Sequence, residues 1–430
     1  MRTIGLLGAI SIGIGGMVGG GIFAVLGEAV SLAHGATALA FFVAGVVALL
    51  TSYSYAKLSV AFQSEGGTVS FVDQAFGHNL LSGSVNLMLW LSYIVTISLY
   101  AVAFSSYGAT FFTDASSLTK HILISVAILL PTFINLVSAS FVSKSETFIV
   151  VIKIVLLIVI IVSGVNYVDA QRFSPEHWGS SFSIVVAGMM IFVAYEGFEL
   201  IANAAKEIKN PEKNLPLAFY SSVLFVIVLY ILIALISVGT VPEAQLLEAK
   251  DYALAIAAKP ALGQIGFTIV AIAALLATFS AINATIYGNA RLGFIIALEG
   301  ELPKFLSKSK KEIPFMGVLT SMGFSLILAN SINIDEIAII GSASFLLIFF
   351  IVNISAWKLH KQIGANLIII VLSSFSTLLA LVTLLYHTYS SNPNAIGVFS
   401  SFILISILFE VFYGRLVRGH LFQRKYGEDG

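Results

Sequence analysis

The sequence predicts an all-α integral membrane protein, and three observations support this prediction. Of its 430 residues, 58% are hydrophobic and 10% are charged, whereas a soluble domain carries about 25% charged residues. The hydrophobic residues gather in segments of about 20 residues or more, the length that a helix needs to cross a bilayer. Two of these segments are interrupted by glycine, and one interruption also carries carboxylates. We expect a single membrane domain over residues 1–420 and a cytoplasmic tail over 421–430.

Twelve apolar segments are long enough to span a membrane. They run well past the ~9–11 residues of a barrel strand and do not alternate between apolar and polar residues, which excludes a membrane β-barrel. The third, sixth and eighth segments are long, so we expect them to tilt or to project from the bilayer. The predicted segments are residues 5–32, 35–62, 80–112, 119–139, 144–166, 181–206, 214–240, 262–297, 314–331, 334–358, 364–388 and 395–417.

The first segment contains the stretch Gly13–Phe23, which reads GIGGMVGGGIF. Six of the nine residues from Gly13 to Gly21 are glycine, which weakens a helix and lets the backbone leave α geometry. Unwound backbone at bilayer depth is tolerated only where it is buried in protein or lines a watery cavity. The stretch therefore predicts a broken helix whose free backbone groups face a ligand. The alternative is close packing of small residues against a neighbouring helix.

The sixth segment carries Glu196-Gly197-Phe198-Glu199 near bilayer depth. Carboxylates are costly there unless they face water or partners, and Gly197 permits a second break. The interrupted segments lie five helices apart and cross in opposite directions, which is typical of an inverted five-helix repeat with its site at the midplane. Alternatively, Glu196 and Glu199 are structural hydrogen-bonding groups. The predicted ranges are 5–166 for the first repeat, 181–358 for the second and 364–417 for two further helices.

Lys153 lies deep in the fifth segment. It follows Lys144 by nine residues, which corresponds to roughly 14 Å along a helix, too deep to reach the membrane surface. Its ammonium must pair with another group, face a cavity, or be neutral part of the time. Because burial lowers the pKa of a lysine toward neutrality, Lys153 is a candidate proton carrier. The alternative is a lysine held permanently by a carboxylate or by carbonyl oxygens.

The distribution of Lys and Arg predicts the orientation. With the N-terminus in the cytoplasm, 17 of these residues fall on the inner side and 4 on the outer side, as the positive-inside rule requires. Both termini are then cytoplasmic, and we expect a multi-pass protein of the cell membrane. Three connections have predicted roles: 63–77 as an inner re-entrant or interfacial helix, 207–216 as an inner polar loop and 243–260 as an outer lid.

The residue pattern argues against other functional classes. The absence of cysteine excludes disulfides and thiolate chemistry, and the zero net charge gives no sign of a nucleic-acid partner. No zinc spacing, nucleophile elbow or phosphate loop occurs, so we expect no enzyme, no catalytic residue, no cofactor and no metal. A channel is disfavoured because no pore-loop motif repeats. No cleavable signal peptide is evident, since the first apolar segment follows Met1-Arg2-Thr3 directly.

Five blocks in order resemble the amino acid–polyamine–organocation transporters, and most closely the proton-coupled amino acid transporters of the ApcT type. The blocks are GGMVGGGIF, GGTVSFVDQAFG, Lys153, AYEGFELIANAAKEIKNPEKNLP and SAINATIYGNARLGFIIALEGELP, the last from Ser280 to Pro303. Segments nine to twelve match only in number and character. The resemblance implies a LeuT-type fold of two inverted five-helix repeats and two C-terminal helices, twelve in all, with helices 1 and 6 broken.

The resemblance also implies a substrate site at the two breaks. Backbone N–H groups of Gly19, Gly20 and Gly21 would bind the substrate carboxylate, in agreement with the positive end of a helix dipole at that point. Tyr195 and Phe198 would shape and gate the side-chain pocket. The ammonium would be received by the carbonyls of Met17, Val18, Val193 and Glu196. Many family members carry a neutral residue at Glu196, which leaves substrate charge open.

In sodium-coupled relatives a sodium ion lies between helices 1, 5 and 8, and the resemblance implies that Lys153 fills its place. Its ammonium would reach the carbonyl near Gly15 or Gly16, and Thr278 or Ser280. We therefore expect proton-coupled symport of a neutral amino acid into the cell, with Lys153 as coupling group and Glu199 as a second proton-coupling candidate. Amino acid/amine antiport, which Glu196 would suit, and sodium-coupled symport are the alternatives. The expected partners are the substrate, the proton and the bilayer, with the oligomeric state left open.

Overall fold

A computed structural model describes residues 2–137, 139–310 and 313–417 of the protein. This part of the chain is helical, with isolated β-bridges and no strand. Ten helices are long and apolar enough to cross a bilayer, and the bent pair α1 (Leu6–Met17) and α2 (Gly21–Ala33) makes an eleventh crossing if counted as one. The prediction of an all-α membrane protein is confirmed. The predicted tail, 421–430, lies outside the described residues.

The long helices follow the predicted apolar segments closely. α14 (Phe315–Ser331) is apolar but has 17 residues, so the predicted count of twelve crossings depends on it and stays a prediction. The sixth crossing consists of three pieces, α8 (Ser181–Met190), η4 (Ile191–Tyr195) and α9 (Leu200–Asn203). The other spans are α3 (Thr37–Ala61), α5 (Leu80–Ala109), α6 (Ser117–Val137), α7 (Ala139–Gly164), α10 (Pro211–Thr240), α13 (Lys259–Leu298), α15 (Ile334–Lys358), α16 (Leu367–Ser391) and α17 (Pro393–Val417).

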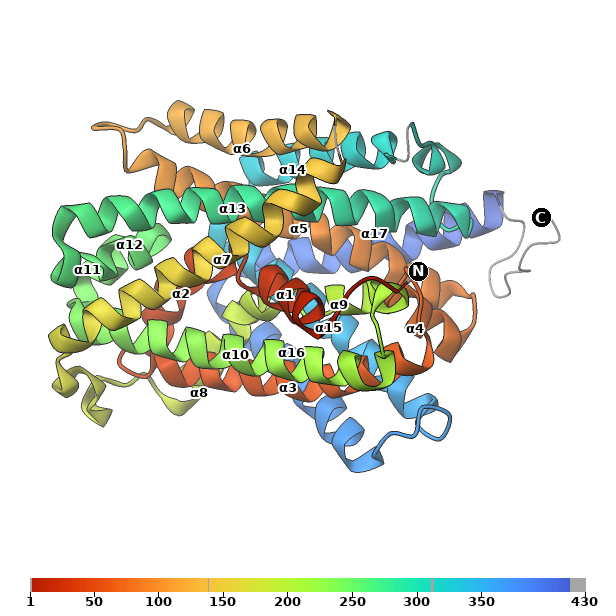
Figure 1. The fold of residues 1–430 in the computed structure, drawn as a ribbon, viewed down its shortest axis with the longest axis horizontal. Helices are drawn as coiled ribbons and strands as arrows, with labels where there is room; N and C mark the ends of the chain where they lie inside the picture. The colour runs from red at the N-terminus through yellow and green to blue at the C-terminus, as the bar shows by residue number, and fades with distance from the viewer. Residues whose placement is uncertain (1, 138, 311–312, 418–430) are drawn as a thin grey trace.

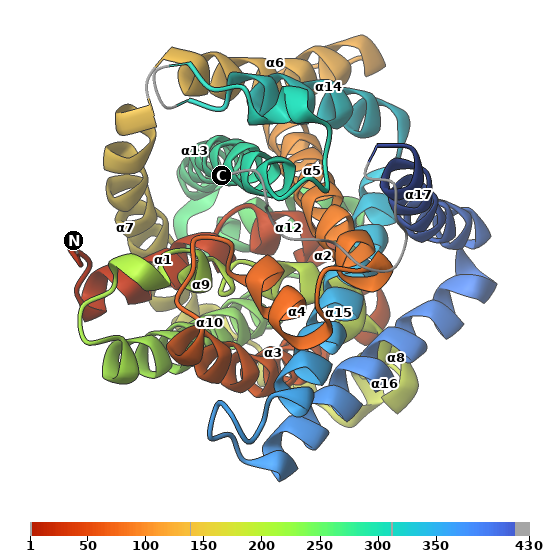
Figure 2. The same ribbon diagram turned by 90° about the vertical axis from the view of Figure 1, so that its right-hand side faces the viewer.

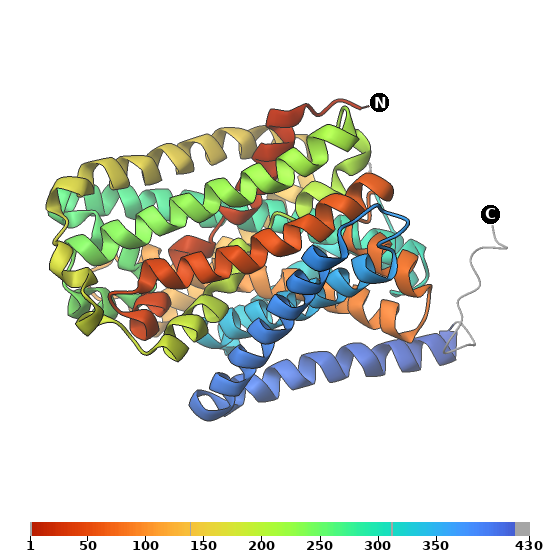
Figure 3. The same ribbon diagram turned by 90° about the horizontal axis from the view of Figure 1, so that it is seen from below.

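The helices form one elongated bundle, with α6 and α14 along one edge, α16 along another and the broken helices near the middle (Figures 1 and 2). α3 packs along α10 and α5 along α13, and Figure 3 shows α10 beside α3 and the long α17 on the surface of the bundle. The central helices are buried because they turn small and apolar side chains toward one another, whereas α16 and α17 expose large apolar residues over much of their length. That exposure suits helices that face lipid.

The two ends of the bundle differ in their connections. One end carries the start of the chain and α4 (Thr68–Phe76), which lies in the predicted interfacial segment 63–77 (Figure 1). We call it the N-terminal end. The opposite end, here the lid end, carries the predicted lid, which folds as α11 (Glu243–Glu248), η6 (Lys250–Tyr252) and α12 (Ala253–Ala257). The remaining short helices are η1 (Val165–Tyr167), η2 (Ala170–Phe173), η3 (Pro175–His177), η5 (Ala205–Glu207) and η7 (Lys304–Ser307).

The loop predicted over 207–216 is shorter than expected. α10 begins at Pro211, three residues before the predicted start of its segment. Proline suits the first position of a helix because its missing N–H is one that the first turn leaves unbonded in any case. The start of the chain pairs with this loop: the Ile4 N–H donates to the Glu207 carbonyl at 3.0 Å, and the Lys209 N–H donates to the Ile4 carbonyl at 2.8 Å.

Candidate functional site

The first predicted break lies at residues 18–20. α1 ends at Met17 and α2 begins at Gly21, with an angle of 49° between the two helices. Val18 closes α1 by donating its N–H to the Ile14 carbonyl at 2.7 Å, but its backbone angles, φ −80° and ψ 42°, are not helical. The glycine-rich stretch therefore interrupts the helix. The interruption lies in the second half of the stretch, because Gly13 to Gly16 remain part of α1.

The second break lies at Glu196 to Glu199. η4 ends at Tyr195, Glu196 is extended with φ −63° and ψ 144°, and α9 resumes at Leu200. Gly197 has φ +119°, a conformation that side chains with a Cβ rarely adopt. The Glu199 carboxylate accepts a hydrogen bond from the Gly197 N–H at 2.7 Å, so it satisfies a backbone donor that the missing helix turn leaves exposed.

The two breaks touch each other. A Cβ built on Gly16 would lie 2.6 Å from the Gly197 carbonyl oxygen, and one built on Gly21 would lie 2.7 Å from Ala194 Cα. Only glycine permits this approach of one backbone to another. Tyr230 of α10 joins the breaks from behind, since its hydroxyl lies 2.7 Å from the Met17 carbonyl and 3.2 Å from the Ala194 carbonyl. The predicted meeting of two interrupted helices is therefore present in the structure.

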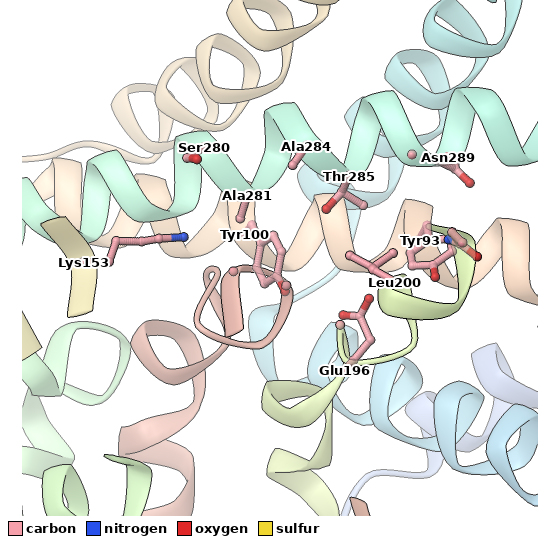
Figure 4. A pocket seen from close by; sticks show the side chains of 15 residues that line it. Tyr93, Tyr100, Lys153, Glu196, Leu200, Ser280, Ala281, Ala284, Thr285 and Asn289 are labelled. Carbon is pink, nitrogen blue, oxygen red and sulfur yellow. The ribbon is translucent and has the colours of Figure 1, made fainter. Parts of the chain in front are cut away.

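A small cavity of about 40 Å³ lies beside this contact. Figure 4 shows Lys153 at one end of its wall and Glu196 on the side opposite α13. The wall is formed by the end of α1, by the second break and α9, by α5, by α7 and by one face of α13. The lining residues are Gly15, Gly16, Tyr93, Tyr100, Lys153, Glu196, Gly197, Leu200, Asn203, Ser280, Ala281, Ala284, Thr285, Gly288 and Asn289.

The predicted lysine group comes together in part. Lys153 is 2% exposed and shares the cavity with Gly15, Gly16 and Ser280. α7 approaches α1 one turn earlier, where Val150 would lie 3.0 Å from a Cβ on Gly15. Thr278, the fourth predicted partner, does not line the cavity, and its hydroxyl donates to the Ala274 carbonyl of its own helix at 2.7 Å.

The two carboxylates of the second break have different surroundings. Glu196 is 4% exposed and lines the cavity, where its carboxylate accepts from the Thr96 hydroxyl at 3.3 Å. Glu199 is 1% exposed and does not line the cavity. It accepts from the Tyr93 hydroxyl at 3.1 Å and from the Gly197 N–H. Glu196 is therefore available to a ligand, whereas Glu199 holds the shape of the break.

The predicted carboxylate donors lie behind an aromatic ring. A Cβ on Gly20 would lie 2.3 Å from Tyr100 Cδ1, and one on Gly19 would lie 3.4 Å from the Tyr100 hydroxyl oxygen. Glycine is required here because the Tyr100 ring packs directly on the backbone. Gly19 and Gly20 therefore border Tyr100, Gly21 meets Ala194 of the other broken helix, and none of the three lines the cavity in this conformation.

Other predicted substrate contacts are engaged elsewhere. The Met17 carbonyl accepts from Tyr230, and the Val193 carbonyl accepts from the Glu196 N–H at 3.3 Å. Tyr195 points toward α3, where its hydroxyl donates to the Phe41 carbonyl at 2.8 Å. Phe198 packs in a fully buried aromatic cluster with Tyr55, Phe219 and Phe349. Tyr195, Phe198, Met17, Val18 and Val193 do not border the cavity.

Sequence reasoning did not single out several lining residues. Tyr93 and Tyr100 lie seven residues apart on α5, so they share one helix face. Ala284 and Gly288 follow Ser280, a residue that was predicted, at intervals of four on α13, and the three form a stripe of small residues that indicates a helix face open to a cavity or a neighbour. Both spacings were available in the sequence, but neither identifies the neighbour that such a face meets.

The cavity continues toward the N-terminal end. A second cavity of about 370 Å³ lies between α1, α9 and α13, and it shares Leu200, Asn203, Ala284 and Gly288 with the first. Its lining also includes Glu65, Tyr287 and Arg291. The two cavities therefore adjoin along the four shared residues.

The lid end is closed above the first break. Lys250 of η6 forms ion pairs with Glu28 of α2 and with Asp335 of α15, the latter at 2.7 Å. Ser106 of α5 donates to Asp251 at 3.3 Å. η6 rests on α2 so closely that a Cβ on Gly27 would overlap the Lys250 carbonyl. The lid therefore joins α2, α5 and α15 over the cavity.

Comparison with known proteins identifies the family. An amino acid permease family model matches residues 4–413. The chain is 33% identical over 413 residues to the inner membrane transport protein YbaT of Escherichia coli, covering 95% of each chain. It is 31% identical over 420 residues to the uncharacterized protein MJ0609 of Methanocaldococcus jannaschii, covering 97% of this chain and 96% of the other. It is 25% identical over 386 residues to the branched-chain amino acid permease BcaP of Bacillus subtilis, covering 84% and 81%. The chain belongs to the amino acid permease family, within the amino acid–polyamine–organocation superfamily of transporters.

Proposed function

We propose that the protein is a secondary active transporter that moves an amino acid into the cell together with a proton. The observation that carries this proposal is the cavity at the contact of two broken helices, with Lys153 in its wall. The family supports it, since relatives are named as a transport protein and as an amino acid permease. Broken helices supply backbone donors and acceptors at the bilayer midplane, where secondary transporters bind charged substrates.

The proposed substrate is a small zwitterion. N–H groups at the start of a helix lack intrahelical partners and lie at the positive end of its dipole, so Gly19, Gly20 and Gly21 suit the substrate carboxylate once the Tyr100 ring turns aside. The ammonium would lie at the Glu196 side of the cavity, with the carbonyls of Met17, Val18, Val193 and Glu196 as acceptors. A volume of about 40 Å³ favours a small neutral amino acid. Tyr195 and Phe198 would act by packing behind this site.

Lys153 is the proposed proton carrier. When protonated it would brace α7 against α1 near Gly15 and Gly16 and against α13 at Ser280, with charge-assisted hydrogen bonds. When neutral it would release the inner half of helix 1. A proton that stabilises one conformation over the other is what couples its movement to that of a substrate.

The proposed topology is the LeuT-type arrangement, with α1 to α7 in the first repeat and α8 to α15 in the second. In this proposal the N-terminal end faces the cytoplasm and the lid end faces the outside, in the cell membrane. The conformation is then open toward the cytoplasm, because the larger cavity lies at the N-terminal end and the lid is closed.

Uptake into proteoliposomes tests the function. The purified protein is reconstituted and offered a panel of labelled amino acids under an imposed pH gradient, an imposed sodium gradient, or neither. We expect accumulation of small neutral amino acids driven by an inward proton gradient and indifferent to sodium. Uptake that requires sodium at constant pH would contradict proton coupling, and no uptake of any amino acid under any gradient would contradict the proposal as a whole.

Exchange of an amino acid for an amine is the second candidate, and Glu196 favours it. A carboxylate in the cavity wall suits a substrate with a net positive charge. Proteoliposomes preloaded with the corresponding amine distinguish the two candidates. Exchange predicts that preloading accelerates uptake at least tenfold in the absence of a pH gradient, whereas symport predicts no such dependence.

A further inference from the structure

Three metal-ligating side chains converge at the N-terminal end, outside both cavities. Asp73 lies on α4, His78 lies between α4 and α5, and Glu301 lies just after α13. One ligand atom from each falls within 4.8 Å of the others, and His78 Nδ1 lies 3.6 Å from Asp73 Oδ2. Asp73 is 8% exposed and Glu301 is 2% exposed. Two carboxylates and an imidazole from three separate elements therefore share one largely buried site.

Asn86 supplies an independent indication. This α5 residue is 1% exposed, and its amide nitrogen donates to Glu301 Oε2 at 2.9 Å and to Asp73 Oδ1 at 3.3 Å. Its amide oxygen is buried and accepts no hydrogen bond from the described part of the chain. In this orientation the oxygen is turned away from the two carboxylates, because the nitrogen faces them. Turning the amide by 180° would bring this oxygen between the two carboxylates, since the two ends of an amide have nearly the same shape.

We propose that Asp73, His78, Glu301 and Asn86 form a binding site for a divalent transition-metal cation of the zinc or manganese type. The donor set combines one imidazole nitrogen with carboxylate and amide oxygens, which suits these ions. Calcium and magnesium prefer sites made of oxygen alone.

Such a cation would connect elements that move in the proposed transport cycle. It would join α4 and the start of α5 to the end of α13, the helix whose other part lines both cavities. The next residue, Leu302, accepts at its carbonyl from the Tyr413 hydroxyl of α17 at 3.0 Å, so the site also adjoins the surface helix. Metal binding here would regulate transport without touching the substrate, and it does not depend on which substrate is carried.

Zinc titration of the purified protein tests the proposal. The metal-free protein, with any purification tag removed, is titrated with Zn²⁺ by calorimetry, and its thermal unfolding is followed with and without Zn²⁺. We expect one ion per chain and a rise in the unfolding temperature, because a ligand that binds only the native state stabilises it. His78→Ala and Glu301→Gln should each weaken binding by about tenfold or more.

His34→Ala provides the matched control. His34 Nδ1 lies 2.6 Å from Glu243 Oε1, an exposed histidine–carboxylate pair at the lid end, so its loss should leave Zn²⁺ affinity unchanged. Wild type without binding at about 1 mM Zn²⁺ would overturn the proposal, as would equal affinity in His78→Ala. Because the His78 side chain is 19% exposed, we expect the His78→Ala protein to fold. Visible absorption of bound Co²⁺, expected in wild type and lost in His78→Ala, reports the ligand directly.

Discussion

Lys153 and Glu196 are the charged residues that the cavity wall brings close to the broken backbone. Both are almost fully buried, and both lie at a depth where charge is retained only for a function or a firm partnership. Glu199, the residue directly before the short helix α9, is buried as well, but its carboxylate accepts hydrogen bonds from the Tyr93 hydroxyl and from the Gly197 N–H. The three residues therefore support three different expectations.

Lys153→Ala should abolish accumulation driven by a proton gradient while substrate binding persists, because the proposed substrate contacts lie on the two breaks. Coupling energies between sites are typically about 1–3 kcal/mol, so the accumulation ratio should fall about 5- to 150-fold. Lys153→Arg should fail too, since a guanidinium keeps its proton. Uptake and equilibrium binding are measured on the same proteoliposomes. Wild-type accumulation by Lys153→Ala would remove the lysine from the coupling role.

Glu199→Ala and Glu196→Gln should separate structure from selectivity. Glu199→Ala leaves the Gly197 N–H without its acceptor and should lower the free energy of unfolding by about 1–3 kcal/mol. Glu196→Gln keeps the shape of its side chain and should change stability little, but should alter the preference between neutral and cationic substrates. Thermal unfolding and competition by unlabelled amino acids measure the two effects. If only Glu199→Ala changed selectivity, the two roles would be exchanged: Glu199 would select the substrate and Glu196 would hold the shape of the break.

At the scale of elements, the site depends on backbone-to-backbone contact between the two breaks. Gly16 and Gly197 meet on the cavity side, and Tyr230 joins Met17 and Ala194 on the other. Each contact involves residues of both broken helices, so each forms only when the two interruptions lie side by side. The pair of breaks therefore behaves as one unit, and a change in either should disturb both.

Gly16→Ala should disrupt this unit, since the added Cβ would lie 2.6 Å from the Gly197 carbonyl oxygen, a backbone atom that cannot turn away. We expect loss of transport and a destabilisation of about 1–3 kcal/mol, as for overpacking of a tight core. Gly323→Ala on α14, where a Cβ would meet nothing within 4 Å, serves as the control. Uptake and thermal unfolding report on both variants, and equal behaviour of the two would show that the contact is dispensable.

The lid should respond to pH through Asp251. Burial raises the pKa of Asp251, the negative charge of Asp335 adds to this, and the Ser106 hydrogen bond opposes it. Because the pKa is raised in the closed lid, closure is favoured below the ordinary aspartate pKa and weakens as pH rises through the raised value. For Lys250, burial lowers the pKa, but hydrogen bonds to Asp335 and Glu28 outweigh it and raise the pKa overall. Lys250 itself therefore loses its proton only in strong alkali.

Hydrogen exchange of the lid measures this response. Between about pH 4 and about pH 7, amide exchange over residues 243–258, corrected for its intrinsic rate, should become faster as the closed lid loses its preference. Asp251→Asn, which keeps a side chain of the same shape near Ser106, should remove most of that change. A lid whose corrected exchange is the same at both pH values in wild type would contradict the role of Asp251.

At the scale of the whole molecule, the apolar segments sufficed to predict the all-α architecture and the position of every long helix. The glycine run and the Glu196-Gly197-Phe198-Glu199 sequence predicted the interruptions, because glycine and buried carboxylate act locally on the helix that contains them. The covering of Gly20 by Tyr100 was not predictable, since it depends on how α5 is rotated about its axis against the first break. Likewise, Asp73 and Glu301 meet only because α4 and the end of α13 are neighbours in space.

Thiol labelling should reveal which end of the cavity is open. The protein has no cysteine, so a single introduced thiol reports without background. Ala284→Cys, in the wall shared by both cavities, should react with a membrane-impermeant reagent from the cytoplasmic side and be protected by substrate. Ser116→Cys, exposed in the loop between α5 and α6, should react only from outside. Labelling of Ala284→Cys from the outer side alone would reverse the proposed direction of opening.

The pairing of Ile4 with the segment around Ile208 has a consequence for motion. The first residues of the chain exchange two backbone hydrogen bonds with the segment that follows α9, so the halves of the two broken helices at the N-terminal end are joined there as well as in contact at Gly16 and Gly197. We expect two half-helices that are held together at both ends to move as one rigid body. In the proposed transport cycle, opening of the cavity at the N-terminal end then needs one hinge between the two breaks, in place of two independent ones.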